Sequence, residues 1–329
     1  MINNSRSPLV SIGMPVHNAE KYLPEALESI KSQTYENFEV IISDNGSTDR
    51  TPEICGKVVS SDSRFIYFRN ETNIGVARNF NRVYELSSGE YFKWWAYDDL
   101  CAPTYLERCV EVLRKEPAVI ICHAKTRIID QTGRVLGDYD DCLHFRSQKP
   151  FQRFREYLFR RAGLWNAIYG LIRSSEFRKT PLHGDYLGAD QVLLGELILR
   201  GEVHRVPESL FFRRGHPDQF WRNNASKAEE LDWFKPGRRE GFWTPVAWKI
   251  FIEYLRALRR VELHWLDKTR CQLYLVVWLS RKLIKPFYFP VKKRLIGLRI
   301  ISEKPKKDPW SDLSADQDRG ISGLSLIHI

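Results

Sequence analysis

Short apolar runs alternate with amphipathic stretches along the first third of the chain. The apolar runs predict strands at residues 9–14, 38–42, 64–68 and 91–95. After the first of them, Leu23, Leu27 and Ile30 recur at helical spacing, and helices are also predicted after the second and third runs. Strands that alternate with helices of this length indicate βαβ units, and therefore an α/β fold around a mostly parallel sheet.

The rest of the chain continues this pattern less regularly. Helices are predicted at residues 103–115, 151–161 and 191–200, strands at 118–123, 166–172, 203–205 and 210–213, and a hairpin at 126–135. The composition shifts after about residue 221. Residues 227–239 are charged and contain Pro236-Gly237, which predicts a linker, whereas residues 247–283 have a helical pattern.

The fourth predicted strand is followed by two adjacent carboxylates, Asp98 and Asp99, and then by Pro103. The other polar loops also follow strands, and the carboxyl ends of parallel strands share one edge of the sheet, where open α/β sheets bind ligands. Paired carboxylate oxygens suit a hard divalent cation, which usually also holds a substrate phosphate. The alternative is a strand end with two solvated aspartates.

The composition of the chain limits the classes of binding partner but does not identify one of them. The chain has 329 residues, 43% hydrophobic and 28% charged, which is enough for a sizeable core. Its net charge of +10 favours anionic partners such as sugar nucleotides, acidic glycans, anionic lipid heads or nucleic acid. The clustered acids would repel phosphates unless a metal intervened, so we expect no nucleic-acid partner. Neither a Gly-x-Gly-x-x-Gly fingerprint nor a P-loop is present.

The six cysteines include no Cys-x-x-Cys pair, so the sequence signals neither a zinc site nor a disulfide framework. Reduced thiols suit a cytoplasmic protein. The short polar stretch at residues 1–8 is unlike a secretory signal, and no run approaches the roughly 18 apolar residues that span a bilayer. We therefore expect a cytoplasmic location, extended by the hypothesis of peripheral contact at the inner membrane face.

Six blocks of residues follow one another in a specific order. They are Pro15-Val16-His17-Asn18 with Glu20 and Tyr22; residues 33–38; residues 43–49; Asn73-Ile74-Gly75 with residues 77–79; Tyr97-Asp98-Asp99 with Pro103; and Gly188-Ala189-Asp190-Gln191. Through these blocks the chain, from residue 9 to about residue 216, resembles a family 2 glycosyltransferase.

The resemblance implies a GT-A fold, with a Rossmann-like, mostly parallel central sheet and flanking helices. It also implies inverting transfer of a sugar from a nucleoside diphosphate sugar to the hydroxyl of a glycan or lipid-linked acceptor, in cell-surface polysaccharide or glycan biosynthesis. The substrate-binding residues it implies are Pro15, Val16, His17, Asn18, Glu20, Asp44, Asn45, Arg78 and Asp98. Two alternatives stay open: Asp44 as an Asx-turn residue and Arg78 as an exposed helix arginine.

The family's metal motif, Asp-x-Asp, is altered in this chain to Ala96-Tyr97-Asp98. The resemblance implies Mg²⁺ or Mn²⁺ held by Asp98, with Asp99 and His216 as further metal residues. For His216 the alternative is a turn histidine before a proline. Because Ala96 replaces the carboxylate that faces the ribose in the family, nucleotide selection is open, and a non-catalytic sugar-nucleotide binder is the alternative function.

Asp190 matches the family's catalytic base. Inverting transfer needs a group that deprotonates the acceptor hydroxyl as it attacks the anomeric carbon, and a positioned carboxylate can accept that proton. The alternative is an N-cap, because aspartate is a favoured residue at the start of a helix.

The expected organisation is a GT-A domain at residues 8–222, divided into a nucleotide-sugar half (8–116) and an acceptor half (117–222). A helical basic extension (223–300) and a disordered tail (301–329) follow, and the last residues resemble a sequencing adaptor. Residues 281–300 hold seven Lys or Arg and no acid, interleaved with aromatics. Such a segment lies on an anionic membrane surface or packs on the core as a solvated tail.

Overall fold

The structure is a computed structural model that describes residues 9–160, 163–216 and 246–297, with side chains up to Ile284. The linker predicted at residues 227–239 and the tail at 301–329 lie outside the described residues. The strands are β1 (Val10–Val16), β2 (Phe38–Asp44), β3 (Phe65–Arg69), β4 (Tyr91–Trp94), β5 (Leu100–Cys101), β6 (Val119–Ile129), β7 (Val135–Tyr139), β8 (Leu171–Arg173) and β9 (Glu202–Arg214). The helices are α1 (Leu23–Lys31), α2 (Thr51–Ser61), α3 (Val76–Glu85), α4 (Tyr105–Lys115), α5 (Pro150–Phe159), η1 (Asn166–Tyr169), α6 (Ser174–Phe177), α7 (Ala189–Arg200), α9 (Val246–Arg260) and α10 (Trp265–Gly297).

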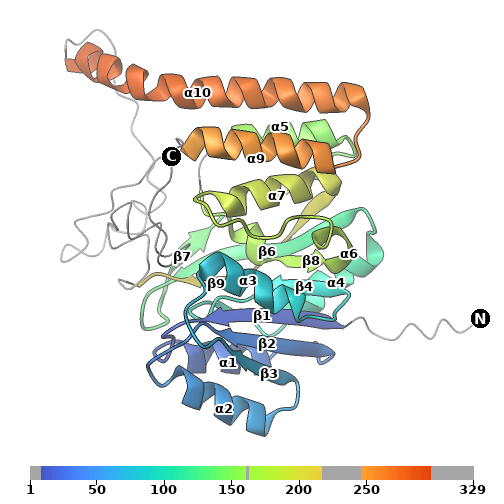
Figure 1. Cartoon of the computed structure of the whole chain (residues 1–329), viewed down its shortest axis with the longest axis vertical. Coiled ribbons are helices and arrows are strands. Elements are labelled where there is room, and N and C mark those ends of the chain that lie inside the picture. Colours follow the sequence, from blue (N-terminus) through green and yellow to red (C-terminus); the bar gives the residue numbers. More distant parts are fainter. Residues whose placement is uncertain (1–8, 161–162, 217–245, 298–329) are drawn as a thin grey trace, which may run out of the picture.

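The described strands form one sheet in the order β3-β2-β1-β4-β8-β6-β9-β5, with β7 paired to β6 (Figure 1). The four strands of the first half are parallel, as predicted, whereas β5, β7 and β8 pair antiparallel with their neighbours. Each antiparallel pairing of this mixed sheet therefore includes at least one strand that follows the acidic pair.

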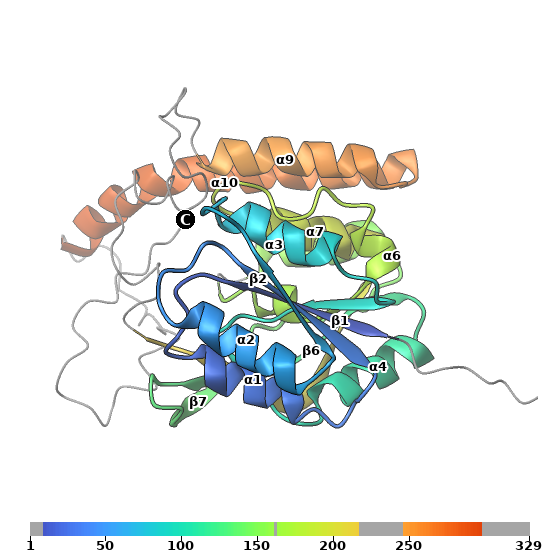
Figure 2. The same ribbon diagram turned by 60° about the horizontal axis from the view of Figure 1, so that its bottom comes forward.

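Each face of the sheet is covered by its own apolar core. Along β4, Phe92 and Trp94 belong to the core beneath α3 and α7, whereas Tyr91 belongs to the core beneath α1, α2 and α4. Successive side chains of a strand point to opposite faces, so a strand that is apolar throughout is buried on both sides. Figure 2 shows the helices divided between the two faces of the sheet.

The first strand is longer than predicted. We expected Pro15 to end it, but β1 continues to Val16, where the Val16 carbonyl accepts the N–H of Asn45 (2.9 Å). The backbone N–H and C=O groups of the odd-numbered residues of β1 point toward β4, and the pairing with β4 ends at Gly13. Pro15 therefore has no strand beside its nitrogen, and its missing N–H costs no ladder bond.

The second half differs from the prediction in its strands. Residues 166–172, predicted as one strand, form η1 and then β8, separated by an extended Gly170. The two short strands predicted at 203–205 and 210–213 are one strand, β9, whose register against β6 slips between Val206 and Ser209. The two residues that slip out include Pro207, which cannot donate to a ladder, so a bulge replaces the break that the pattern predicted.

The C-terminal helices α9 and α10 form an outer layer over α5 and α7 (Figure 1). Buried residues from both helices, including Tyr254 and Leu275, belong to the same apolar core as α7. No helix of the described part of the chain is long and apolar enough to cross a membrane.

Candidate active site

The loops after β1 and β2 are hydrogen-bonded to each other. The side-chain oxygen of Asn18 accepts the N–H of Thr48 (2.9 Å), and Glu20 accepts the N–H of Arg50 (3.0 Å). Asn18 has a left-handed backbone (φ 47°), which asparagine tolerates better than most residues. His17, which precedes Asn18, is exposed. The first predicted nucleotide loop is therefore built as one unit with the second.

The carboxylate of Asp44 is buried at the end of β2. One of its oxygens accepts the N–H of Ser47 (2.8 Å), and the other accepts the hydroxyl of Tyr67 (2.6 Å). The first of these bonds is of the turn-forming kind expected in the alternative interpretation of Asp44. Asn45 donates to the side chain of Asn73 (2.7 Å), which ties the loop after β2 to the start of α3. Nucleotide contacts of Asp44 and Asn45 stay a prediction.

The block at residues 73–79, which leads into the first turn of α3, contains hydrogen-bonded amide side chains. Asn79 accepts the hydroxyl of Ser43 (2.7 Å) and donates to the Ser43 carbonyl (2.9 Å). Gly75 caps α3 with φ 88°, a conformation that favours glycine. Arg78 lies exposed in the first turn of this helix, so it is accessible to a ligand at the loops. Its contact with a nucleotide stays a prediction.

The acidic pair is held by the end of β9. The N–H of Arg214 donates to Asp99 Oδ1 (2.9 Å), and Arg214 Nε donates to the carbonyl of Asp98 (2.9 Å). The imidazole Nε2 of His216 lies 3.0 Å from Asp98 Oδ2. Two of the predicted metal residues, 118 positions apart in sequence, are therefore in contact, and Asp99 is fixed beside them.

Arg214 and His216 are themselves anchored on α1. The buried guanidinium of Arg214 donates to Glu25 Oε2 (2.6 Å) and lies 5.1 Å from the centre of the Tyr22 ring. The same ring lies 4.6 Å from the His216 ring. A guanidinium removed from water needs such partners, because an uncompensated buried charge is strongly destabilising. Arg214, which sequence reasoning did not select, thus positions the acidic loop.

The two aspartates have different environments. The side chain of Asp98 keeps 14% of its exposure, whereas Asp99 is buried. Burial, and then the charge of Asp98, raise the pKa of Asp99 to about 8, although Arg213, the Arg214 N–H and Lys93 act in the opposite direction. Asp98 is thus the carboxylate that remains available to a ligand.

Lys93 lies fully buried behind this loop, inside a strand that the sequence pattern predicts as apolar. Its ammonium lies 4.5 Å from the ring centre of Tyr105, 5.1 Å from Trp95 and 5.4 Å from Phe211, and it donates to the carbonyl of Tyr169. Burial lowers the pKa of Lys93. The rings and the carbonyl stabilise the ammonium by cation–π attraction and a charge-assisted hydrogen bond.

Asp190 lies in the first turn of α7, and its Oδ1 accepts the N–H of Gln191 (2.8 Å). The N-cap of the helix is Gly188, with φ 83°, so the alternative interpretation of Asp190 as the cap is wrong. Burial raises the pKa of the Asp190 carboxyl, opposed by His183, the Gln191 N–H and Arg213. A carboxylate with a raised pKa is better matched to accept a proton near neutral pH.

His183, missed in the sequence, lies in electrostatic contact with Asp190. Its backbone is held by two hydrogen bonds with the side chain of Asn81 (2.9 and 3.0 Å), and its Nδ1 lies 2.8 Å from the carbonyl of Gly184. Burial lowers the pKa of His183. A carbonyl partner requires a proton on Nδ1, which leaves Nε2 as the acceptor in the neutral ring.

Arg213 connects the two acidic parts of the site. Its positive charge lowers the pKa of both Asp99 and Asp190, so it lies within electrostatic reach of each. Its Nη1 donates to Asn166 Oδ1 (2.6 Å), and Asn166 donates in turn to the hydroxyl of Thr126 (2.9 Å). Asn166 is buried and holds this arginine. The only signal for Arg213 in the sequence was its place at the end of the last predicted strand.

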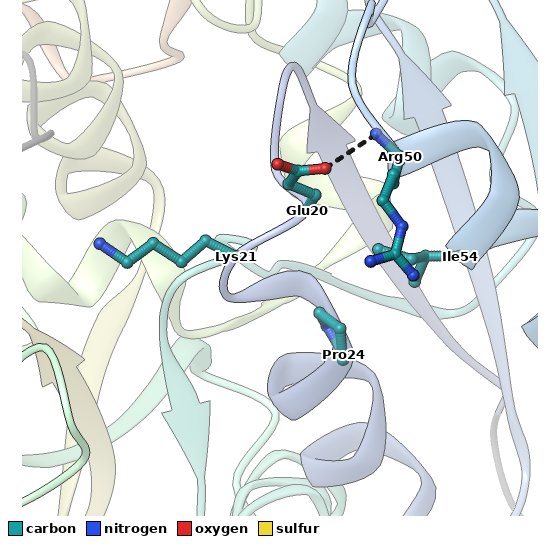
Figure 3. A pocket seen from close by; sticks show the side chains of 5 residues that line it. All are labelled: Glu20, Lys21, Pro24, Arg50 and Ile54. Carbon is teal, nitrogen blue, oxygen red and sulfur yellow. Dashed lines mark hydrogen bonds between the residues drawn. The ribbon is translucent and has the colours of Figure 1, made fainter.

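A surface hollow of about 390 Å³ lies on the outer side of the first two loops (Figure 3). Its lining consists of Glu20, Lys21, Pro24, Arg50 and Ile54. Of these residues, only Glu20 belongs to the predicted site, and it is occupied by the bond to the Arg50 N–H drawn in Figure 3. The hollow therefore does not include the acidic pair or Asp190.

Within the part of the chain that the structure describes, no three His, Cys, Asp or Glu side chains are grouped closely enough to hold a metal ion. Asp98 and His216 offer one carboxylate and one imidazole. Cations that act on phosphates commonly take one or two protein ligands and complete their coordination with phosphate oxygens and water. The donor set present fits a cation held jointly with a diphosphate, and not a cage of protein ligands alone.

Comparison with known proteins assigns the chain to a family. The model of "Glycosyl transferase family 2" matches residues 11–169. An uncharacterised glycosyltransferase of Rickettsia typhi is 36% identical over 70% of this chain and 72% of its own length, and one of Haemophilus influenzae is 34% identical over 80% and 82%. EpsH of Bacillus subtilis, which carries a glycosyltransferase name, is 29% identical over 64% of this chain, a match that spans only 56% of EpsH.

Comparison with solved structures identifies the fold. TarS of S. aureus, in a structure with UDP-GlcNAc, superposes with a TM-score of 0.60 at 15% identity, covering 81% of this chain and 71% of TarS. The fold is thus that of the GT-A enzymes, as predicted. The chain belongs to glycosyltransferase family 2, so the predicted family and enzyme class are also confirmed.

Proposed function

We propose that the protein is an inverting glycosyltransferase that moves a sugar from a nucleoside diphosphate sugar to a hydroxyl of a glycan or lipid-linked acceptor, in cell-surface polysaccharide biosynthesis. The observation that supports this most strongly is the 3.0 Å contact between Asp98 and His216, together with Arg213, whose charge acts on both Asp99 and Asp190. A group for the phosphates and a proton acceptor on one edge of the sheet are what this reaction requires.

The donor would bind at the joined loops after β1, β2 and β3. The residues we propose for this contact are Pro15, Val16, His17, Asn18, Glu20, Asp44, Asn45 and Arg78. The exposed Arg78 would approach the diphosphate, because a guanidinium suits phosphate oxygens. TarS has been solved with UDP-GlcNAc, so a uridine diphosphate sugar is the first donor to test.

Mg²⁺ or Mn²⁺ would be held by Asp98 and His216, with Asp99 supporting the loop from behind. When bound, the cation offsets negative charge on the departing diphosphate. Arg214 fixes this loop through the bonds to Asp98 and Asp99, so the residues that meet the diphosphate are rigid before it arrives.

Asp190 would accept the proton of the acceptor hydroxyl. As that proton moves to the carboxylate, the hydroxyl oxygen forms a bond to the anomeric carbon, and the bond to the diphosphate oxygen breaks with its electron pair. Attack from the face opposite the leaving group inverts the configuration. Burial raises the pKa of Asp190, which favours this role, whereas the charges of His183 and Arg213 favour the ionised carboxylate.

A non-catalytic sugar-nucleotide binder is the second candidate, and Ala96 is the observation that favours it. This position carries a carboxylate in the family motif, so its loss alters the contact with the ribose. A binder would hold the donor without turnover, whereas the enzyme would consume it in the presence of the right acceptor.

The test is a thermal-shift screen of nucleoside diphosphate sugars, with and without Mn²⁺, on the parent and on Asp98→Ala. A ligand that binds only the folded state raises the melting temperature, so the parent should respond to one donor more strongly with the cation. Asp98→Ala should lose the cation-dependent part of that shift. Asp138→Ala removes an exposed carboxylate on β7 and serves as the control. An equal response from Asp98→Ala and the parent would remove Asp98 as the metal residue.

A further inference from the structure

Large apolar side chains are exposed along α10. Those that are exposed by 40% or more are Trp265 (68%), Leu266 (42%), Leu273 (60%), Val276 (56%), Val277 (43%), Leu283 (40%) and Ile284 (60%). Single exposed apolar residues are ordinary, but a contiguous row of them on one element indicates an interaction surface. Nothing in the proposed chemistry uses this row.

The row has helical geometry. Leu266, Leu273, Val277 and Ile284 are separated by seven, four and seven residues, which places them on one face of the helix. The opposite face, which includes Leu275, is buried in the core. The stripe is about 27 Å long at 1.5 Å per residue. In Figure 1, α10 is the outermost layer of the molecule, so the stripe lies on the outside of the protein.

The surroundings of the stripe are basic. Residues 246–284 contain eight Lys or Arg and three Asp or Glu, and residues 285–300 add five Lys or Arg without an acid. Arg270 and Arg281 lie beside the stripe, each with its guanidinium close to a ring of α5, Phe151 at 4.6 Å and Phe159 at 4.8 Å. These contacts restrict where the two charges can point.

We propose that the outer face of α10, defined by Leu266, Leu273, Val277 and Ile284, docks on the surface of an anionic lipid bilayer. An apolar stripe flanked by Lys and Arg is the pattern of a helix that lies in the plane of the interface, with its apolar side in the acyl boundary and its charges at the headgroups. A second copy of the chain suits this face less well, because a two-fold contact would bring the same basic flanks together.

This inference deepens the proposed function, because it names the surface by which the enzyme would meet a lipid-linked acceptor. The helix that carries Asp190 is bound to the outer layer formed by α9 and α10. Tyr254 of α9 donates to the carbonyl of Gln191 (3.1 Å), and Arg260 pairs with Glu196 (2.6 Å). Docking through α10 therefore puts the acceptor half next to the membrane, and the nucleotide half, at the other end of the molecule in Figure 1, toward the aqueous phase.

The test is flotation of the full chain with vesicles of equal parts phosphatidylglycerol and phosphatidylcholine, compared with vesicles of phosphatidylcholine alone. The parent should float with the anionic vesicles and less with the neutral ones, and added salt should weaken the binding. The double variant Leu273→Glu with Val277→Glu should reduce the bound fraction roughly tenfold or more, because both side chains leave the acyl boundary. Ile66→Glu changes an exposed apolar residue (41%) on β3, far from α10, and should bind as the parent does.

Melting temperature and donor-induced stabilisation are measured on the same preparations, so a failure of the proposed function is distinguished from a failure of docking. Equal flotation of the double variant and the parent would overturn the proposal. A parent that does not bind anionic vesicles would also overturn it. A parent that forms a dimer, dissociated by the same double variant, and does not float would show that a second copy occupies the stripe.

Discussion

The carboxylate of Asp190 is the group on which the proposed proton transfer depends directly. Asp190→Asn keeps the size of the side chain and its place in the first turn of α7, and the N-cap is Gly188, so stability should change little. The amide cannot accept the acceptor's proton, so turnover should fall by about 10²–10⁴-fold while donor affinity stays near that of the parent. Steady-state rates, donor binding and melting temperature on one preparation measure this. Turnover within a few-fold of the parent would place the base elsewhere.

Arg213 should influence the pH at which the proposed base works. Because burial raises the pKa of Asp190, the rate should decline, as pH falls, at a pH above the range of about 4 that is usual for aspartate. Arg213 lowers this pKa, so Arg213→Gln should move the acidic limb of the rate profile to higher pH. Arg127→Gln, which removes an exposed arginine paired with Asp138 (3.0 Å), is the control and should leave the limb in place. A limb that is unchanged in both variants would exclude the influence of Arg213 on Asp190.

Single residues divide between those that the sequence could select as candidates and those that it could not. Asp98 and Asp190 stand in short motifs that follow a strand or begin a helix, so the sequence could select them; their roles stay predictions. Arg213 and Lys93 were not selected, because an arginine near the end of a strand is usually an exposed polar side chain, and a lysine in an apolar run carries no sign of the rings around it. Their roles arise from contacts with residues far away in the chain.

At the scale of elements, the turn before α7 is the structure that aims Asp190. Gly188 has φ 83°, and a Cβ at this position would lie 2.7 Å from the end of the Ile250 side chain on α9. Gly188→Ala should therefore destabilise the fold by about 1–3 kcal/mol, because alanine is strained at this φ, and it should lower turnover, because the turn positions the proposed base. Gly56→Ala in α2 meets open space and should be neutral or stabilising. Chemical denaturation and rate measurements on both variants test this, and equal behaviour would contradict it.

The elements of the first half were predictable, because β1, β2 and β4 are buried on both faces and each helix has an apolar side of regular period. The second half was less so. Pro207 marked a break that the structure absorbs as a bulge in β9, since β6 supplies a long partner on both sides of it. Residues 166–172 look like a strand, yet Asn166 and Gly170 turn the chain into η1 before β8 begins. In both places the neighbouring strand determines where the strand begins or breaks. A local sequence pattern carries no information about that neighbour.

At the scale of the whole molecule, the outer layer of α9 and α10 shares its packing with α7, the helix that carries Asp190. Glu196 of α7 is buried and pairs with Arg260 of α9 (2.6 Å) and with Arg200 of its own helix (2.8 Å). The apolar residues of α10 that face inward lie in the same core as those of α7. Forces on the outer layer therefore reach the helix that carries Asp190 through direct contacts.

This shared core predicts that the chain unfolds as one cooperative unit. Leu275 of α10 is fully buried, whereas Leu273, two residues away on the same helix, is 60% exposed. Leu275→Ala should cost about 2–5 kcal/mol, because it removes buried methyl groups and leaves a cavity. Leu273→Ala, the matched control, should stay within about 0.5 kcal/mol of the parent.

The measurement is calorimetry together with donor-induced stabilisation. In Leu275→Ala the single transition should move to lower temperature, and donor binding should disappear in that same transition, because the helix that carries Asp190 loses its support when α10 leaves. A separate early transition, with donor binding retained beyond it, would show instead that α9 and α10 form an independent unit attached to a self-sufficient catalytic domain.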